Sequence, residues 1–155
     1  RERSSAFAAC IAAHRPKLGG QVFESLGNDP DNEVALDAEL RALRRRAGRG
    51  AGAKGEAGGG GAAVIAGNAV VTLRVAQAMA RLGWHFGSEL GFVGFDDPDW
   101  ASLIGPGLST VSQPTDAIGR TAAECLIERL QGLDAAPRQL LLKGELRVRG
   151  SSLRA

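Results

Sequence analysis

Three aspartates follow an apolar run without a spacer in the segment ELGFVGFDDPDW, residues 89–100. Asp96, Asp97 and Asp99 could bind a divalent cation, act as a catalytic pair, cap a helix or hold a hydroxyl-rich ligand. The segment does not fit an EF-hand calcium loop, because counting from Asp97 puts Ser102 where that loop needs glycine. The carboxylates that cleave glycosides stand about 5–10 Å apart across a cleft, whereas adjacent side chains diverge. The pattern therefore favours ligand binding over catalysis.

The position of each aspartate after the predicted strand suggests a different role for it. Asp97 and Asp99 precede Trp100 and are suited to cap a following helix. Asp96 comes immediately after the strand, where its carboxylate can accept two hydrogen bonds from the vicinal hydroxyls of a sugar or ribose. We therefore predict that Asp96 binds a ligand and that Asp97 provides local support or a cap.

The other residue types that carry catalysis or bind metals are scattered along the sequence. His14 and His85 have no partners at metal-ligand or catalytic-triad spacing, and no serine lies in a G-x-S-x-G context. Cys10 and Cys125 are far apart and lack a CxxC spacing, which predicts reduced, buried side chains. The sequence thus predicts no catalytic residue, no metal site and no cofactor.

A glycine-rich segment, residues 47–61, contains a formal G-x-G-x-x-G pattern at 50–55. A dinucleotide-binding loop needs a strand before that pattern and a helix starting inside it, whereas here an arginine-rich helix end precedes it. The segment is not a phosphate-binding Walker loop either, because Lys54 is followed by Gly55. No aromatic residues alternate with the nearby basic side chains, so we interpret the segment as a solvated loop.

Short apolar strands alternate with amphipathic helices along the chain. The predicted strands cover residues 21–26, 62–67, 90–95, 139–142 and 145–149. The predicted helices run from near the first residue to 14, from the capping turn at 27–32 to 46, from 69 to about 82, and over 115–130. This alternation predicts an α/β fold of βαβ units with a parallel sheet covered on both faces. In such sheets ligands bind at the carboxyl ends of the strands, where both Asn68 and Asp96 lie.

The composition is that of an ordinary soluble domain. The 155 residues are 44% apolar and 23% charged, and the formal net charge of +2 is too small to argue for a nucleic-acid or membrane partner. No apolar run approaches the ~20 residues of a membrane span, and no signal-peptide pattern is present. We therefore expect a cytoplasmic protein without membrane contact. Because the chain opens with a helix and without methionine, we also expect it to be part of a longer protein.

Several segments, in order along the chain, resemble one family. GFVGFDD, PGLSTVSQP, IGRTAAECLIERLQG and ELRVRGS resemble the effector-binding domain of lactose/galactose-repressor-type (LacI/GalR) transcriptional regulators. Upstream, AAVIAGN before a helix ending in ARLG, and RSSAF at residues 3–7, resemble further elements of that domain. The resemblance implies a periplasmic-binding-protein-like (type I) fold, in which two α/β subdomains are hinged around a small effector.

The resemblance also implies a domain organisation. Residues 1–155 would be a partial effector-binding domain, mainly its C-terminal subdomain, with 113–132 belonging to the crossover into the N-terminal subdomain. The DNA-binding helix-turn-helix is absent from this chain, so DNA would be bound only through a missing domain. The helix 115–130 would pack on the missing subdomain, and we expect its apolar stripe to be exposed in this chain alone.

Four residues match the effector-binding positions of this family. Arg3, Asn68 and Asp96 would form a polar clasp, and Gln113 at the crossover is a further candidate. An arginine fork with a carboxylate and an amide suits a polyol, and the arginine could also hold a carboxylate or phosphate. The sequence departs from the family where its Asn-Asp pair is Asn68-Ala69, which leaves the effector's identity open.

These observations predict a non-enzymatic sensor: the part of a ligand-responsive transcriptional regulator that binds a sugar-like or nucleoside-like effector. The resemblance implies a homodimer, and helix 69–82, with its stripe of Val71, Val75 and Met79, is the candidate interface, although that stripe would equally suit the core. One alternative is a periplasmic sugar-binding protein of an ABC-type transporter. Another is a metal-dependent α/β enzyme using Asp96 and Asp97.

Overall fold

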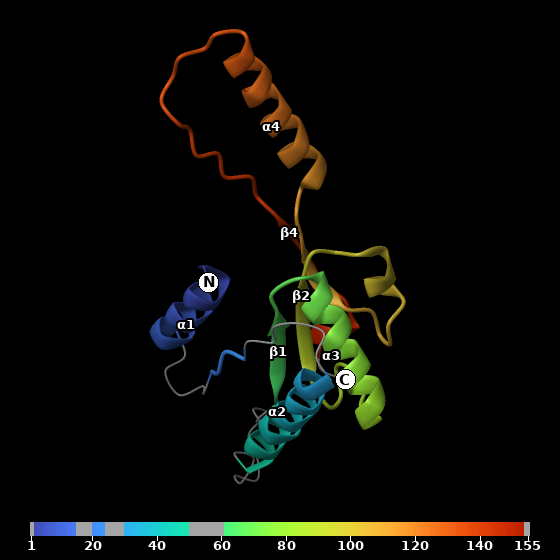
Figure 1. The fold of residues 1–155 in the computed structure, drawn as a ribbon. Coiled ribbons are helices and arrows are strands. Elements are labelled where there is room, and N and C mark those ends of the chain that lie inside the picture. Colours follow the sequence, from blue (N-terminus) through green and yellow to red (C-terminus); the bar gives the residue numbers. More distant parts are fainter. Residues whose placement is uncertain (1, 15–19, 24–29, 50–60, 154–155) are drawn as a thin grey trace.

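The computed structural model describes residues 2–14, 20–23, 30–49 and 61–153 (Figure 1). These ranges contain four α-helices, four strands and two short 3-10 helices. In the same ranges, no helix is long and apolar enough to cross a membrane. The greater part of the predicted glycine-rich loop, residues 50–60, lies outside the described residues.

The strands form one sheet in the order β1-β2-β3-β4. Their bounds are β1 Ala63–Ala66, β2 Gly91–Phe95, β3 Ser109–Ser112 and β4 Glu145–Arg147. β1, β2 and β3 are parallel, with Ala66 opposite Gly94 and Gly94 opposite Thr110. β4 is antiparallel to β3, because the chain leaves the sheet through β3 and returns through β4. The predicted parallel sheet is therefore confirmed for three of the four strands.

Two of the predicted strands differ from the structure. Residues 139–142 are not a strand, and Leu141 is 88% exposed, because the sheet ends at β4 and offers them no neighbour to pair with. Residues 21–23 are likewise not in a strand, and 24–26 lie outside the described residues. The predicted coverage of both sheet faces also fails at β1, where Ile65 is exposed.

The helices lie close to their predicted positions. Their bounds are α1 Glu2–His14, α2 Pro30–Arg49, α3 Ala69–Leu82 and α4 Thr115–Leu130, with 3-10 turns η1 Asp99–Ser102 and η2 Gly150–Ser152. α3 begins where the Asn68 side chain accepts a 2.9 Å hydrogen bond from the Val71 backbone N–H. It ends at Gly83, whose φ of 64° is the left-handed conformation that glycine adopts without steric penalty.

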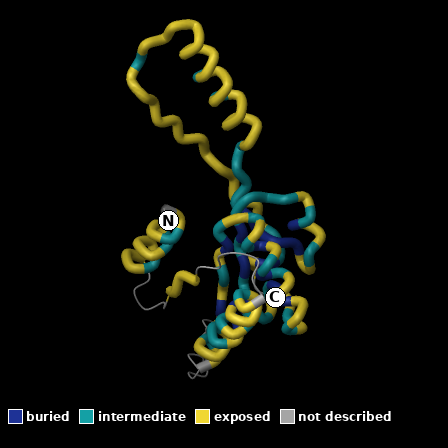
Figure 2. Tube along the Cα trace, viewed as in Figure 1, coloured by how far each residue is buried: buried dark blue, intermediate teal, exposed yellow. Residues whose placement is uncertain are grey.

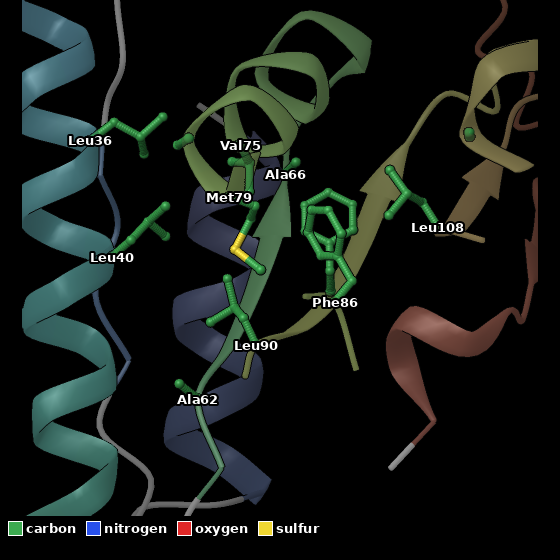
Figure 3. Close-up of a cluster of buried hydrophobic side chains, with 12 residues drawn as sticks. Leu36, Leu40, Ala62, Ala66, Val75, Met79, Phe86, Leu90 and Leu108 are labelled. Atoms are coloured by element: carbon green, nitrogen blue, oxygen red, sulfur yellow. The ribbon is translucent and has the colours of Figure 1, made fainter. Parts of the chain in front are cut away.

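The core lies between α2, α3 and the sheet (Figure 3). Leu36 and Leu40 of α2 lie on the side of α3 that carries Val75 and Met79, both only 1% exposed. On β2, the ring of Phe92 packs edge-on against that of Phe86, with 5.2 Å between centroids.

The stripe of Val71, Val75 and Met79 that we considered for a dimer interface is therefore core, because Val75 and Met79 are buried and Val71 packs against them. Residues of α3 that face outward, such as Val70 and Leu73, are exposed instead. The two cysteines also differ from expectation: both are free, but Cys10 is exposed and Cys125 is half-buried.

α4 projects away from the rest of the molecule (Figure 1). None of its residues is buried, and Leu126 and Leu130 are 60% and 78% exposed (Figure 2). The chain reaches α4 from β3 and comes back into β4, so that this pair of strands forms a neck between the packed body and the helix. The expected exposure of the apolar residues of helix 115–130 is confirmed.

Candidate functional site

Asn68 and Asp96 follow adjacent parallel strands and lie at the same edge of the sheet. Ala66 of β1 pairs with Gly94 of β2, so the two polar residues, each two positions further on, leave the sheet side by side. The Ala69 backbone N–H donates to Asp96 Oδ2 at 3.1 Å, while Asn68 Oδ1 caps α3. Both side chains thus meet the amino terminus of α3, whose partial positive charge stabilises a carboxylate.

The backbone of Asp96 is in the left-handed conformation, with φ of 62°. No other non-glycine residue in the described ranges has a positive φ. Aspartate is one of the few side chains that tolerate this conformation. The Asp96 N–H still donates to the Val111 carbonyl oxygen at 3.1 Å, which ties the end of β2 to β3. The local backbone therefore restricts which residue types can occupy this position.

Gln113 joins the same site from the end of β3. Its side-chain amide donates a hydrogen bond to Asp96 Oδ1. Gln113 lies two residues before the first residue of α4, so Asp96 is in contact with the chain just where it leaves the body. The two carboxylate oxygens of Asp96 consequently have different partners, one on α3 and one on the neck.

Arg3 reaches this edge from α1. Its guanidinium lies over the ring of Phe95, 4.4 Å from the centroid, and donates to the carbonyl oxygen of Gly67. Gly67 and Phe95 immediately precede Asn68 and Asp96. The structure therefore brings all four predicted residues together at the carboxyl edge of the sheet.

The four side chains retain hydrogen-bonding capacity for a polar ligand. A carboxylate has about four lone-pair directions, and Asp96 receives one bond on each oxygen from the described residues. The Asn68 side-chain oxygen accepts the capping hydrogen bond of α3. Its side-chain N–H₂ group donates to no acceptor among the described residues. Arg3 adds donors in a planar fork. This combination of one acceptor and several donors matches a molecule with several hydroxyls.

Of the two roles predicted for Asp97, support and capping, the structure shows support. Its carboxylate accepts hydrogen bonds from Thr110 Oγ1 at 2.6 Å, from Arg149 Nη1 at 2.8 Å and from Arg147 Nη1. Its side chain is 6% exposed, and the bond from Arg149 is the main reason that its pKa falls from 3.8 to about 2. The carboxylate is thus a brace, charged at neutral pH, that connects the end of β2 to β3, to Arg147 at the end of β4 and to Arg149 just after it.

The predicted capping role of Asp97 or Asp99 is wrong. η1 is preceded by Pro98 and has no side-chain cap. Asp97 is instead turned towards the two arginines at the returning end of the chain. In the sequence, Arg147 and Arg149 alternate with apolar residues, which puts both cations on one face of a strand. That pattern was the signal from which a buried carboxylate partner could have been predicted.

A second buried contact that the sequence did not reveal holds η2 in place. The Ser109 backbone N–H donates to Ser151 Oγ at 2.7 Å, and Ser151 Oγ donates to the Phe92 carbonyl oxygen at 2.9 Å. Both serines are fully buried. Together with the brace at Asp97, these bonds fix the carboxy-terminal segment against β2 and β3.

Comparison with known proteins assigns the chain to a family. The model of the family described as "Periplasmic binding protein-like domain" matches residues 1–152. The chain belongs to this family. This periplasmic binding protein-like chain is 38% identical over 151 residues to the HTH-type transcriptional regulator PtxS of Pseudomonas plecoglossicida, covering 97% of the chain and 39% of that protein. It is 37% identical over 89 residues to the HTH-type transcriptional regulator KdgR of Bacillus subtilis, covering 57% of the chain and 26% of that protein.

Solved structures share the fold. A LacI-family regulator from Enterococcus faecium with bound ribose superposes with a TM-score of 0.72 at 18% identity, covering 99% of this chain and 51% of that one. A periplasmic binding protein/LacI transcriptional regulator from Alkaliphilus metalliredigens, complexed with D-xylulofuranose, gives 0.70 at 19% identity, covering 95% and 49%. The predicted α/β, periplasmic-binding-protein-like fold and the resemblance to LacI/GalR-type regulators are confirmed. The chain spans about half the length of these structures and 39% of PtxS.

Proposed function

We propose that this chain is the effector-sensing part of a ligand-responsive, DNA-binding transcriptional regulator, and that its effector is a sugar-like small molecule. The observation that carries the proposal is the convergence of Arg3, Asn68, Asp96 and Gln113 at one edge of the sheet. The names of the relatives, HTH-type transcriptional regulators, and the sugars in two solved neighbours support it.

Each of the four side chains has a distinct proposed role. Asp96 accepts hydrogen bonds from two neighbouring hydroxyls of the effector, and the Asn68 amide donates to a third oxygen. Arg3 donates from the α1 side and closes the site against solvent. Gln113 is hydrogen-bonded to Asp96, so a ligand that binds this carboxylate changes the contacts of Gln113 at the start of the neck. The site binds and releases its ligand without chemical change, so we propose no catalytic residue.

The proposed mechanism uses the projecting helix. Residues 113–132, which include α4, cross into a second subdomain of the full-length protein, and residues 1–155 make up mainly the C-terminal subdomain. The exposed apolar residues of α4 then pack on the second subdomain. An effector that contacts both sides shifts their relative orientation, with a coupling of ~1–3 kcal/mol typical of such switches. A helix-turn-helix elsewhere in the full-length protein, which acts in the cytoplasm, reads that shift.

The proposed regulator is a homodimer, as the resemblance to LacI/GalR-type regulators implies. Because Val75 and Met79 are buried in the core, α3 can contribute only its outward face to a dimer. Val70 and Leu73 lie three positions apart on that face and are exposed, which makes them the proposed contact to a second copy. The test is the oligomeric state of a Leu73→Asp variant of the full-length protein by light scattering, with dissociation as the expected result.

The binding site is tested with Asp96→Ala in the full-length protein. A thermal-shift screen of sugars and nucleosides first identifies an effector, and titration calorimetry then measures its affinity for the wild type and the variant. We expect Asp96→Ala to abolish binding while the protein stays folded, with a lower unfolding temperature because alanine is strained at a φ of 62°. Asp96→Asn, which adopts this φ readily, is expected to weaken binding while its unfolding temperature without ligand stays close to that of the wild type. Asp99→Ala is the matched control, since Asp99 is an exposed aspartate three residues away. Equal affinity of Asp96→Ala and wild type would disprove the site.

The upstream reading frame tests the class of protein. A helix-turn-helix before residue 1 is the expected result, whereas a signal sequence there would assign the chain to a periplasmic sugar-binding protein of a transporter. Thermal stability in millimolar Mg²⁺ or Ca²⁺ tests the metal-dependent alternative at Asp96 and Asp97. We expect no shift with either cation.

A further inference from the structure

A shallow, open hollow lies between α2 and Trp84, two residues past the end of α3. It has a volume of about 350 Å³ and is lined by Arg41, Arg44, Arg45 and Trp84. The three arginines recur at i, i+3 and i+4, so they share one face of α2. Three guanidinium groups and an indole thus surround one concavity.

The positive charge of this hollow is balanced only in part by the described residues, through the charge interaction of Glu89 with Arg44. Elsewhere on these helices arginines are paired with acids: Arg46 with Glu39 at 3.5 Å, and Arg81 with Asp37 at 2.9 Å. Arg41 and Arg45, in contrast, have no carboxylate partner among the residues that the structure describes. They lie four positions apart on the helix, where two like charges repel each other. An anion in the hollow would relieve that repulsion.

The remaining arginine is stacked and not ion-paired. Arg44 lies over the Trp84 ring, 4.7 Å from its centroid. The nearby carboxylate of Glu89 is already engaged, since the Ser88 hydroxyl and the His85 N–H donate to it at 2.7 and 2.8 Å. Those two bonds, more than the charge of Arg44, lower the pKa of Glu89. Arg44 therefore keeps its N–H donors for another acceptor while its plane is held by the indole.

The hollow is separate from the site at Asp96. Trp84 follows the carboxyl-terminal cap of α3, and its backbone N–H donates to the Met79 carbonyl oxygen at 2.9 Å, which fixes the start of the turn. α3 begins at the carboxyl edge of the sheet and runs back to the amino edge, before β2 begins (Figure 1). The two sites thus lie at opposite edges of the same sheet.

We propose that this hollow binds the phosphate group of a phosphorylated small molecule. Planar guanidinium forks match the tetrahedral array of phosphate oxygens, and several such donors recognise a dianion better than a monoanion. The indole edge supplies an apolar wall for the organic part of the ligand. The size of the hollow fits one small ligand, whereas a nucleic-acid backbone would call for a longer basic track.

Titration calorimetry of the full-length protein with sodium pyrophosphate tests the proposal, with sodium chloride at equal ionic strength as the reference. We expect saturable binding of pyrophosphate and none of chloride. An Arg41→Gln, Arg45→Gln double variant is expected to weaken binding at least about tenfold, since each removes charge-assisted hydrogen bonds. Glutamine keeps a good helix propensity on this exposed face.

Two matched variants separate this site from general charge and from the effector site. Arg46→Gln removes the same charge from the next position of α2 but lies outside the hollow, and we expect its affinity to stay within about twofold. Asp96→Ala is expected to leave pyrophosphate binding unchanged, even if it abolishes effector binding.

Three results would overturn the proposal: equal responses to pyrophosphate and chloride, equal losses in Arg46→Gln and the double variant, or loss of pyrophosphate binding in Asp96→Ala. If the protein does not bind pyrophosphate, and the double variant binds random duplex DNA more weakly than the wild type does, the proposal is wrong and this face binds nucleic acid.

Discussion

Helices α3 and α4 are of similar length but have opposite surroundings. α3 buries Thr72, Val75, Ala78 and Met79 and is closed by Asn68 and Gly83 at its two ends. α4 buries no residue and has no side-chain cap at its first turn. Most of its residues are exposed (Figure 2), and Leu126 and Leu130 are among them. One helix is therefore held by packing. The other is held by its chain connections and by surface contacts with the returning segment, such as the ion pair between Glu128 and Arg138.

The candidate site lies where these two helices begin. Asp96 receives one hydrogen bond from the first residue of α3 and another from Gln113, just before α4 begins. The site thus lies at the boundary between a packed region and an unpacked one. A ligand bound there contacts both, which is the arrangement a sensor needs if binding is to change the position of one region relative to the other.

The largest expected effect is in the body. Phe92→Ala removes a fully buried ring that packs on Phe86, and we expect it to lower the free energy of unfolding by about 3–5 kcal/mol. Urea denaturation followed by circular dichroism measures this loss. A loss below about 1 kcal/mol would mean that the body is not the packed unit described above.

An intermediate effect is expected at the neck. Asp97→Asn removes the charge that Arg149 and Arg147 share, and we expect a loss of about 2 kcal/mol at pH 7, corresponding to the drop in the Asp97 pKa from 3.8 to about 2. A carboxyl whose pKa is lowered by folding stabilises the fold above its usual pKa. That contribution disappears as the pH falls through its folded pKa.

The pH dependence provides the measurement for this prediction. The difference in unfolding free energy between wild type and Asp97→Asn is expected to be complete above about pH 5, to shrink as the pH falls through 3.8 and about 2, and to vanish near about pH 1. Asp99→Asn serves as the control, since it is the same substitution at an exposed aspartate two residues away. A pH-independent difference would show that Asp97 contributes through its shape and not through its charge.

The smallest effect is expected in the projecting helix. Leu126→Ala in this chain removes a side chain that is mostly exposed, so the free energy of unfolding is expected to change by less than about 0.5 kcal/mol. In the full-length protein the same substitution is expected to cost about 2 kcal/mol or more, if α4 packs on a second subdomain. Equally small losses of unfolding free energy in this chain and in the full-length protein would contradict the proposed packing of α4 on that subdomain.

The sequence predicted local features well because they depend on local physics. Periodicity set the bounds of α3 and α4, and the strand-end position of Asn68 and Asp96 follows from parallel topology. Arg3 and Gln113 came from the family resemblance alone. Their packing on Phe95 and Asp96 joins residues distant in sequence, which no local pattern encodes.

The misses have a common physical cause. Asp97 was expected to support or cap the chain next to it, but its support comes from Arg149, 52 positions away in the chain. Residues 139–142 have strand-like composition, yet they have no strand to pair with. The stripe on α3 suited both a core and an interface, and only the position of α2 decided between them. In each case the deciding partner lies far along the chain.

The left-handed backbone at Asp96 has a practical consequence for biosensor engineering. Glycine and asparagine are the natural alternatives that adopt a φ of 62° readily, so most members of a saturation library at this position are lost to backbone strain before their ligand preference is tested. Changes of ligand specificity are better attempted at Asn68, Gln113 and Arg3, where the backbone does not restrict the residue types that can be introduced. The position most central to the site is thus the one with the least freedom to evolve.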